Sequence, residues 1–456
     1  MKILRSDAFI IFIGTFIVCY IAFLNHFPLV YDDTGTYVSS GFEHYLPNDR
    51  PVFYGIFIRH ISLATSLWFV VLAQGLLISY TVFRTFDMFY SGNKRNFLFI
   101  TSIIFLTVFT GISHNVSIIL PDIFSPIGIL CLLTLLLNNK ISKWQRGVLI
   151  VILTYCMLVH FSNFLIFSSL TFLLLAYNIV RRIKKKPVAF KRNRLIGIYA
   201  SLLSVLVITP VVNYSYSKQF VYSKGSHVFM IAHLLETGIL DDYLRNECAH
   251  KNYKLCNYVG NYGGNFMWDW NTSPLYKMGG WDSTRKEYNA IILDIVTTPK
   301  YAKELILQGF EYSFIEMFSF DIPKNGVYLG DSPPLSVINK YFPKYFGVYT
   351  SSLQNIGALD FTLTDEFQRI LVFASLALLL CVIVSASLFN ILPTELKWLT
   401  VLILVFGYLN AAICANFSTI HNRFQNRIAW LVPMVAIMVA EHLISNYLQK
   451  KKSNPS

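Results

Sequence analysis

The sequence Tyr31-Asp32-Asp33-Thr34-Gly35-Thr36-Tyr37 follows directly on the first long apolar run of the chain. It places two adjacent carboxylates and two tyrosines where a hydrophobic segment leaves the bilayer. Charge is costly at such a position unless it is solvated or used in chemistry. Asp33 and Asp32 are therefore the first candidates for catalytic groups. Asp33 is favoured, because Thr34-Gly35 after it would let the backbone turn close to a ligand.

The composition places this acidic motif in a membrane protein. Hydrophobic residues make up 54% of the 456 residues, and charged residues only 14%, which is too apolar for a soluble domain of this length. Ten apolar runs approach the length of a spanning helix, and they cover 8–25, 65–83, 97–112, 118–137, 148–162, 164–180, 196–213, 369–392, 398–417 and 428–447. The sequence predicts an all-α polytopic protein with about ten transmembrane helices.

The apolar runs divide the chain into three predicted parts. Residues 1–213 form an N-terminal transmembrane module, whose first outward loop, 26–64, contains the acidic motif. Residues 214–368 form an extracytoplasmic domain that we expect to be mixed but mostly helical, and residues 369–456 form C-terminal transmembrane helices. Within the middle part, the apolar periodicity predicts helices over 231–244 and 284–296.

Basic residues predict the orientation of these helices. Lys and Arg gather in alternate loops, most densely at 181–194 and again at 450–452, and short cytoplasmic loops retain such charge. Both termini are then cytoplasmic, and the acidic motif faces outward. The formal net charge of +13 does not indicate nucleic-acid binding, because the basic residues are spread over short loops and form no single water-facing surface.

Cysteine placement agrees with this orientation. Five of the seven cysteines lie inside apolar runs, whereas Cys248 and Cys256 lie in the outward part. Two closely spaced cysteines outside the cytoplasm most simply form a disulfide. A metal site is the weaker interpretation, because no second pair follows at metal-site spacing.

Further polar groups lie at the outward ends of the predicted helices. Asp122, after Pro121 at the start of an apolar run, either caps that helix or supplies a second carboxylate on the same side of the membrane as the acidic motif, and we weigh the two equally. Arg423 and Arg427 break the positive-inside pattern, and they suit either a bound phosphate or lipid headgroups. His160 is more commonly a satisfied interhelical histidine than a catalytic one.

Loop 260–270 combines flat rings with amide and carboxylate groups, among them Trp268, Asp269 and Trp270. Sugars favour this composition, and a core or interfacial aromatic cluster explains it equally well. The sequence contains no phosphate-binding loop, nucleophile elbow, zinc-binding helix or dinucleotide fingerprint. That disfavours nucleotide-driven transport and ordinary hydrolase chemistry.

The order of these features resembles the GT-C superfamily of membrane glycosyltransferases, which includes protein O-mannosyltransferases, oligosaccharyltransferases and bacterial aminoarabinose transferases. The shared features are an acidic motif in a long first outward loop, an acidic residue in the next outward loop and a late outward domain. Three segments also look similar to bacterial polytopic proteins of this superfamily: Asp49-Arg50-Pro51-Val52-Phe53-Tyr54-Gly55, Leu120-Pro121-Asp122-Ile123-Phe124 and Arg423-Phe424-Gln425-Asn426-Arg427-Ile428-Ala429-Trp430.

The resemblance implies inverting transfer of a sugar from a polyprenyl-phosphate donor to lipopolysaccharide or another surface glycan or lipid. The site would face the periplasm from a bacterial inner membrane. The implied roles are Asp33 or Asp32 as a base or as a carboxylate that positions Mg²⁺ or Mn²⁺, Asp122 as a supporting group, and Arg423 and Arg427 on the donor phosphate. The other candidates come from the residues themselves: Asp49 and His114 as supporting groups, Arg50 on the donor phosphate, and Trp268, Asp269 and Trp270 on the sugar or acceptor.

Two other classes of protein stay open at this point. A transporter or flippase for a lipid-linked sugar would need charges buried in mid-membrane, and the apolar runs contain few acidic residues. An outward-facing acyltransferase would need a nucleophile at the membrane surface, for which His114 and His160 are available.

Overall fold

The computed structural model describes residues 6–324 and 326–453. These residues form helices joined by turns and loops. Within them, the extended backbone pairs only at an isolated bridge between Leu29 and Ile118. The predicted all-α class is confirmed.

Six helices in the described part of the chain are long and apolar enough to cross a membrane, which indicates a multi-pass membrane protein. They are α5 (Trp68–Phe86), α10 (Phe161–Ile183), α11 (Arg192–Ser217), α19 (Thr362–Val384), α21 (Thr394–Phe417), and α22 (Asn422–Ala429) continued by α23 (Leu431–Ser453).

The other four predicted spans are helical but do not meet the same length and hydropathy. They correspond to α1 (Asp7–Val18) with α2 (Tyr20–Leu24), α6 (Gly92–Phe109), α8 (Phe124–Leu137) and α9 (Lys143–Leu158). The first is interrupted at Cys19, and α8 begins only after a 3₁₀ turn at Pro121–Ile123. α6 and α9 each have two basic residues in their first turns. The structure thus supports six of the ten spans.

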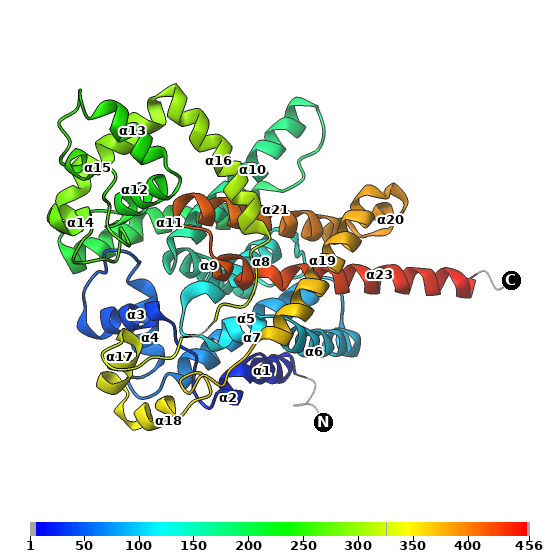
Figure 1. Cartoon of the computed structure of the whole chain (residues 1–456). Coiled ribbons are helices and arrows are strands. Elements are labelled where there is room, and N and C mark those ends of the chain that lie inside the picture. The colour runs from blue at the N-terminus through cyan, green and yellow to red at the C-terminus, as the bar shows by residue number, and fades with distance from the viewer. Residues whose placement is uncertain (1–5, 325, 454–456) are drawn as a thin grey trace.

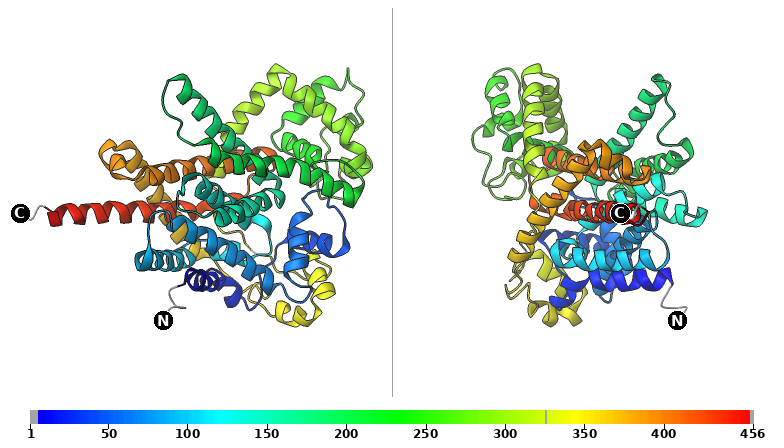
Figure 2. Two further views of the ribbon diagram at one scale, coloured as in Figure 1. Left: turned by 180° about the vertical axis from the view of Figure 1, so that it is seen from behind. Right: turned by 90° about the vertical axis from the view of Figure 1, so that its right-hand side faces the viewer.

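The long membrane helices lie side by side, and most of the helices between residues 226 and 350 lie at one end of them (Figures 1 and 2). Among these, α16 (Pro299–Met317) runs from that end along α21. The acidic motif, at the start of α3 (Asp32–Glu43), lies at this same end, which we call the α3 end. The basic last turns of α10 and α23 point the other way in Figure 1. The acidic motif and the basic last turns of α10 and α23 therefore lie at opposite ends of the molecule.

Residues 214–368 pack in two parts. The first part encloses a hydrophobic core of its own, and we call it the helical domain: α12 (Ser226–Glu236), α13 (Ile239–Glu247), α14 (Pro274–Lys277), α15 (Gly280–Thr297) and α16 (Pro299–Met317). The second part, α17 (Pro333–Tyr341) and α18 (Phe346–Thr350), packs into the core of the membrane helices. Cys248 and Cys256 form a disulfide just after α13.

The helical domain shows how glycine decides helix ends. The single helix predicted over 231–244 is wrong, because Gly238 adopts a φ of +77° and separates α12 from α13. The helix predicted over 284–296 lies within α15, which begins earlier, behind Gly279 at a φ of +96°.

α3 (Asp32–Glu43) contains the acidic motif and is clamped between two helices. Gly41 packs on α4 (Phe53–Ile61) so closely that a Cβ there would lie 2.1 Å from the carbonyl oxygen of Gly55. A Cβ at Gly35 would lie 2.5 Å from Cβ of Pro333 in α17. Gly35 therefore admits a neighbouring helix and not a ligand, which corrects the expectation from the sequence. The clamp fixes the direction of Asp33.

Candidate active site

Asp33 is held between two arginines that come from distant parts of the chain. Its Oδ1 accepts a hydrogen bond from Nη2 of Arg50 at 3.0 Å, and its Oδ2 accepts one from Nη1 of Arg423 at 2.9 Å. Arg50 also donates to Asp49 through Nε at 2.9 Å. Segments 49–55 and 423–430 thus meet at the acidic motif.

Segment 120–124 joins these two segments through Asp122. Nη1 of Arg427 lies 3.3 Å from Oδ1 of Asp122, and Nε of Arg423 lies 3.7 Å from its Oδ2. The Arg427 and Asp122 side chains are 0% and 1% exposed, so this ion pair is buried. Arg427 also donates to Asn410 at 2.7 Å and to Ser162 at 3.2 Å, as a buried guanidinium requires.

Together these groups form one ion-pair network of three carboxylates and three guanidinium groups: Asp33, Asp49, Asp122, Arg50, Arg423 and Arg427. Burial raises the pKa of the Asp33 carboxyl, but Arg50 and Arg423 outweigh it and hold that pKa well below its usual range. Asp33 is therefore ionised at neutral pH. It becomes a stronger base when its arginines are drawn to another anion.

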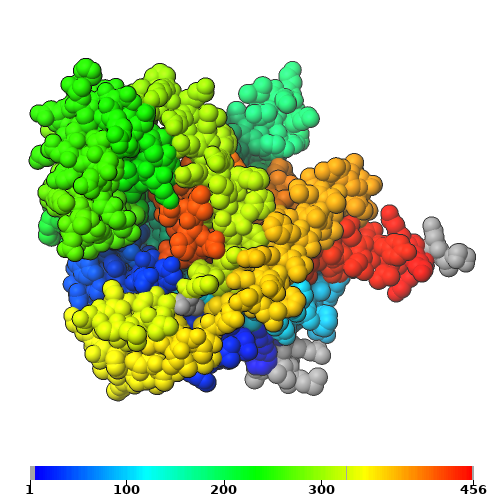
Figure 3. All heavy atoms as spheres, viewed as in Figure 1, coloured from blue at the N-terminus to red at the C-terminus, as the bar shows by residue number. Residues whose placement is uncertain are grey.

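The network borders a cavity of about 310 Å³, which we call the arginine cavity. Asp33, Arg50 and Arg423 line one side, and the apolar side chains of Leu165 in α10 and Ile413 in α21 line another. Trp268 and two further residues of the helical domain also line it. In Figure 3, orange-red residues near the α21–α22 junction are visible between the green helices of the helical domain and the yellow-green α16.

Two residues that the sequence analysis did not assign also line the arginine cavity. Oη of Tyr31 lies 3.4 Å from Nε2 of His421, and the Tyr31 ring lies under the Arg423 guanidinium at 5.0 Å. Nδ1 of His421 accepts the Arg423 backbone N–H at 3.1 Å and so caps α22. Tyr31 belongs to the acidic motif itself, and His421 lies two residues before Arg423, so their positions in the sequence were the available signal.

Of the three sugar-binding candidates in loop 260–270, only one lines the arginine cavity. Trp268 lines the arginine cavity, whereas Asp269 accepts backbone N–H groups of Asn271 and Thr272 within its own turn, each at 3.0 Å. Trp270 stacks on Tyr276 at 4.4 Å, away from this cavity.

Two further candidates lie apart from the arginine cavity. Asp32 is exposed at the start of α3 and is absent from the cavity wall. His114 is buried on α7 (Ile112–Ser117) with its ring edge-on to Phe361 at 5.2 Å. Conversely, His160 does line the cavity, where its Nδ1 accepts the backbone N–H of Ser162 at 3.2 Å.

The side chains around Asp33 do not fit a divalent metal ion. Mg²⁺ and Mn²⁺ prefer several free oxygen ligands, but both oxygens of Asp33 and Oδ1 of Asp122 are already paired with arginine. Among the described residues, no three His, Cys, Asp or Glu side chains converge as a metal site would require. No reaction step is therefore assigned to a metal.

Glu316 connects the helical domain to α22. It lies near the end of α16, fully buried, and its Oε2 accepts the backbone N–H of His421 at 2.8 Å. Its Oε1 has no hydrogen-bond partner among the described residues. Burial raises the pKa of Glu316 to about 8, so the side chain is mostly a neutral acid at pH 7. Nothing in the sequence around Glu316 signals this role.

Replacing Glu316 with glutamine is expected to preserve the fold near α22, because a neutral amide oxygen accepts the same N–H. Glu316→Leu is expected to lower the melting temperature, because it leaves that buried N–H unpaired. A carboxyl with a raised folded pKa stabilises the protein at low pH, and this stabilisation is lost as pH rises through the folded value. The melting temperature of the wild type relative to Glu316→Gln should therefore fall between pH 4.5 and about pH 8. Equal destabilisation by both substitutions would contradict this assignment.

Comparison of the chain with protein-family models, curated proteins and solved structures finds no match. The function is therefore argued from the geometry and chemistry of the site.

Proposed function

We propose that this protein is a membrane glycosyltransferase that moves a sugar from a polyprenyl-phosphate donor to a surface glycan or lipid. The main support is the arginine cavity, in which Arg50 and Arg423 stand beside the carboxylate of Asp33. A lipid phosphate needs guanidinium donors for its head and an apolar path for its chain. The apolar side chains of α10 and α21 in the cavity wall offer such a path.

Asp33 is the proposed base of this reaction. The acceptor hydroxyl oxygen attacks the anomeric carbon from the side opposite the phosphate, so the configuration inverts. The new carbon–oxygen bond forms as the bond from that carbon to the phosphate oxygen breaks. The hydroxyl proton passes to Asp33, and the lipid phosphate leaves on Arg50 and Arg423.

The ion pairs explain how donor binding prepares the base. While Arg50 and Arg423 are both bound to Asp33, its lowered pKa makes it a weak proton acceptor. A donor phosphate competes for the same guanidinium groups. Its binding weakens the ion pairs to Asp33 and raises the basicity of the carboxylate at the moment when the sugar is in place.

The proposed orientation places the α3 end outside the cytoplasm, facing the periplasm of a bacterial cell. The basic last turns of α10 and α23 point away from this end, as the positive-inside rule expects for cytoplasmic ends. With the four shorter apolar helices counted as spans, the proposed topology has the ten spans that the sequence predicts.

Substituting Arg423 with glutamine is expected to weaken binding of undecaprenyl phosphate by about 10-fold or more, because a charge-assisted hydrogen bond contributes about 1.5–3 kcal/mol. Binding is measured on purified protein in lipid nanodiscs. Arg245→Gln, an exposed arginine of α13 paired with Asp241, is the matched control and should bind as the wild type does. Equal affinity of Arg423→Gln and wild type would contradict the phosphate site.

The reaction itself is tested with membrane vesicles that contain the protein and a polyprenyl-phosphate donor with a radiolabelled sugar. Label that becomes covalently attached to membrane glycans or lipids supports a glycosyltransferase. Label that crosses the membrane but stays on its lipid would instead favour a flippase. Vesicles without the protein provide the baseline.

A further inference from the structure

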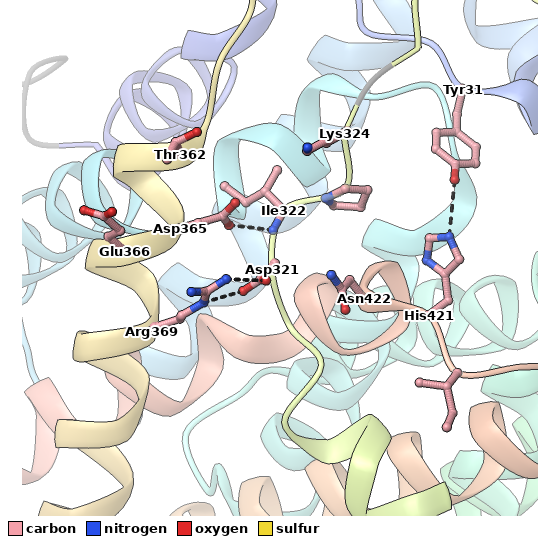
Figure 4. Close-up of a pocket in the computed structure, with 12 residues that line it drawn as sticks. Tyr31, Asp321, Ile322, Lys324, Thr362, Asp365, Glu366, Arg369, His421 and Asn422 are labelled. Carbon is pink, nitrogen blue, oxygen red and sulfur yellow. Dashed lines mark hydrogen bonds and ion pairs between the residues drawn. The ribbon is translucent and has the colours of Figure 1, made fainter.

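A second cavity shares one wall with the arginine cavity. It has a volume of about 650 Å³ and lies between residues 321–324, the first turns of α19 and the start of α22 (Figure 4). Tyr31 and His421 line both cavities, and their side chains face each other across 3.4 Å. Two ligands placed in the two cavities would thus be separated by little more than these two side chains.

The segment 321–324 is tied to α19, so this wall of the second cavity is well defined. Nε and Nη2 of Arg369 donate to the two carboxylate oxygens of Asp321 at 2.7 and 2.5 Å. The backbone N–H of Ile322 donates to Asp365 at 2.6 Å. Figure 4 shows these bonds between the segment and the helix, on the side away from Tyr31 and His421.

The chemistry of the second cavity differs from that of the arginine cavity. Its one arginine, Arg369, already holds Asp321 with both donors described above. Three carboxylates and one lysine complete its charged lining, so it does not favour a phosphate. Glu366, Thr362 and Asn422 present carboxylate, hydroxyl and amide groups. These groups pair well with the hydroxyls of a sugar.

We propose that the second cavity binds the acceptor, a hydroxyl-bearing glycan group that approaches from the aqueous side. This proposal rests on the proposed function, because it needs a donor in the arginine cavity. The acceptor hydroxyl reaches the anomeric carbon past Tyr31 and His421, its oxygen forms the new bond to that carbon, and its proton goes to Asp33. The lipid phosphate departs within the arginine cavity, so the two products leave by different routes.

Filling the second cavity tests this assignment. Glu366→Trp places a large ring in the cavity from an exposed position of α19, and Thr362→Trp does so from one turn earlier. Leu363→Trp is the matched control, because Leu363 is exposed on the same helix and is absent from the cavity wall. Purified variants are compared in detergent for transfer of labelled sugar to detergent-extracted native membrane glycans, for binding of undecaprenyl phosphate, and for melting temperature.

We expect both cavity-filling variants to need about 10-fold more glycan extract for half-maximal transfer, with undecaprenyl phosphate affinity within about twofold of the wild type. Leu363→Trp should match the wild type in all three measurements. Normal transfer by Glu366→Trp and Thr362→Trp would overturn the acceptor site, as would a loss of phosphate binding equal to the loss of transfer. A wild-type protein that binds the phosphate but transfers no sugar would overturn the proposed function, and this proposal with it.

Discussion

Replacing Asp33 with asparagine is expected to lower the rate of sugar transfer by about 100-fold or more, because the reaction loses its proton acceptor. Binding of undecaprenyl phosphate should be retained or strengthened in the same variant. Removing the carboxylate frees the Arg50 and Arg423 guanidinium groups that now bind its two oxygens. A loss of activity together with intact phosphate binding distinguishes a base from a residue that only holds the site together.

Asp32→Asn is the matched control for this experiment. Asp32 is adjacent in sequence but exposed, and it does not line the arginine cavity. Transfer by Asp32→Asn should stay within about twofold of the wild type, as for most exposed substitutions. A large loss in Asp32→Asn with normal activity in Asp33→Asn would reverse the assignment of the base. Melting temperatures of both variants verify that they fold.

Breaking the ion pair of Asp122 and Arg427 is expected to destabilise the protein strongly. Both side chains are buried, and removing one partner of a buried pair costs about 3–5 kcal/mol because the other charge stays unpaired. Asp122→Asn and Arg427→Gln should therefore each lower the melting temperature in detergent. The double substitution should melt above either single variant, because it removes both charges and leaves Asp33, Arg50 and Arg423 paired.

An exposed ion pair provides the control for this measurement. Arg369 and Asp321 are 53% and 32% exposed, so Arg369→Gln should cost at most about 1 kcal/mol. If Arg427→Gln melts like Arg369→Gln, the buried pair does not stabilise the fold. If the double variant melts below both single variants, the side chains act independently of each other.

The two experiments separate two halves of the ion-pair network. Asp33 has a side-chain exposure of 25% and borders the arginine cavity, whereas Asp122 is buried among helices. The Asp33 half is thus accessible to a ligand, and the Asp122 half holds α22 in register with the start of α8. Arg423 contacts both carboxylates and joins the halves. A ligand bound at Arg423 would therefore affect the ion pairs of Arg423 to both Asp33 and Asp122.

The amino-acid sequence by itself determined the class of the protein and most of its helices. Apolar runs near the thickness of a bilayer predict helices whatever they pack against, because the backbone must satisfy its hydrogen bonds locally in lipid. The pairing of Cys248 with Cys256 was also predicted, since they lie eight positions apart in a single segment that the sequence predicts to face outward. Charge at the ends of apolar runs was enough to single out Asp33, Asp122 and Arg423.

Only the tertiary structure decided which of these groups meet and which face the cavity. Asp33 and Arg423 are 390 residues apart, and their contact depends on how α3 and α22 pack, which no local pattern encodes. That Asp33 lines the arginine cavity and Asp32 does not follows from the clamp that sets the rotation of α3. The burial of Glu316 and the second cavity were likewise unpredictable. Glu316 is buried only because α16 packs against the start of α22, and the cavity exists only because segment 321–324 lies beside α19.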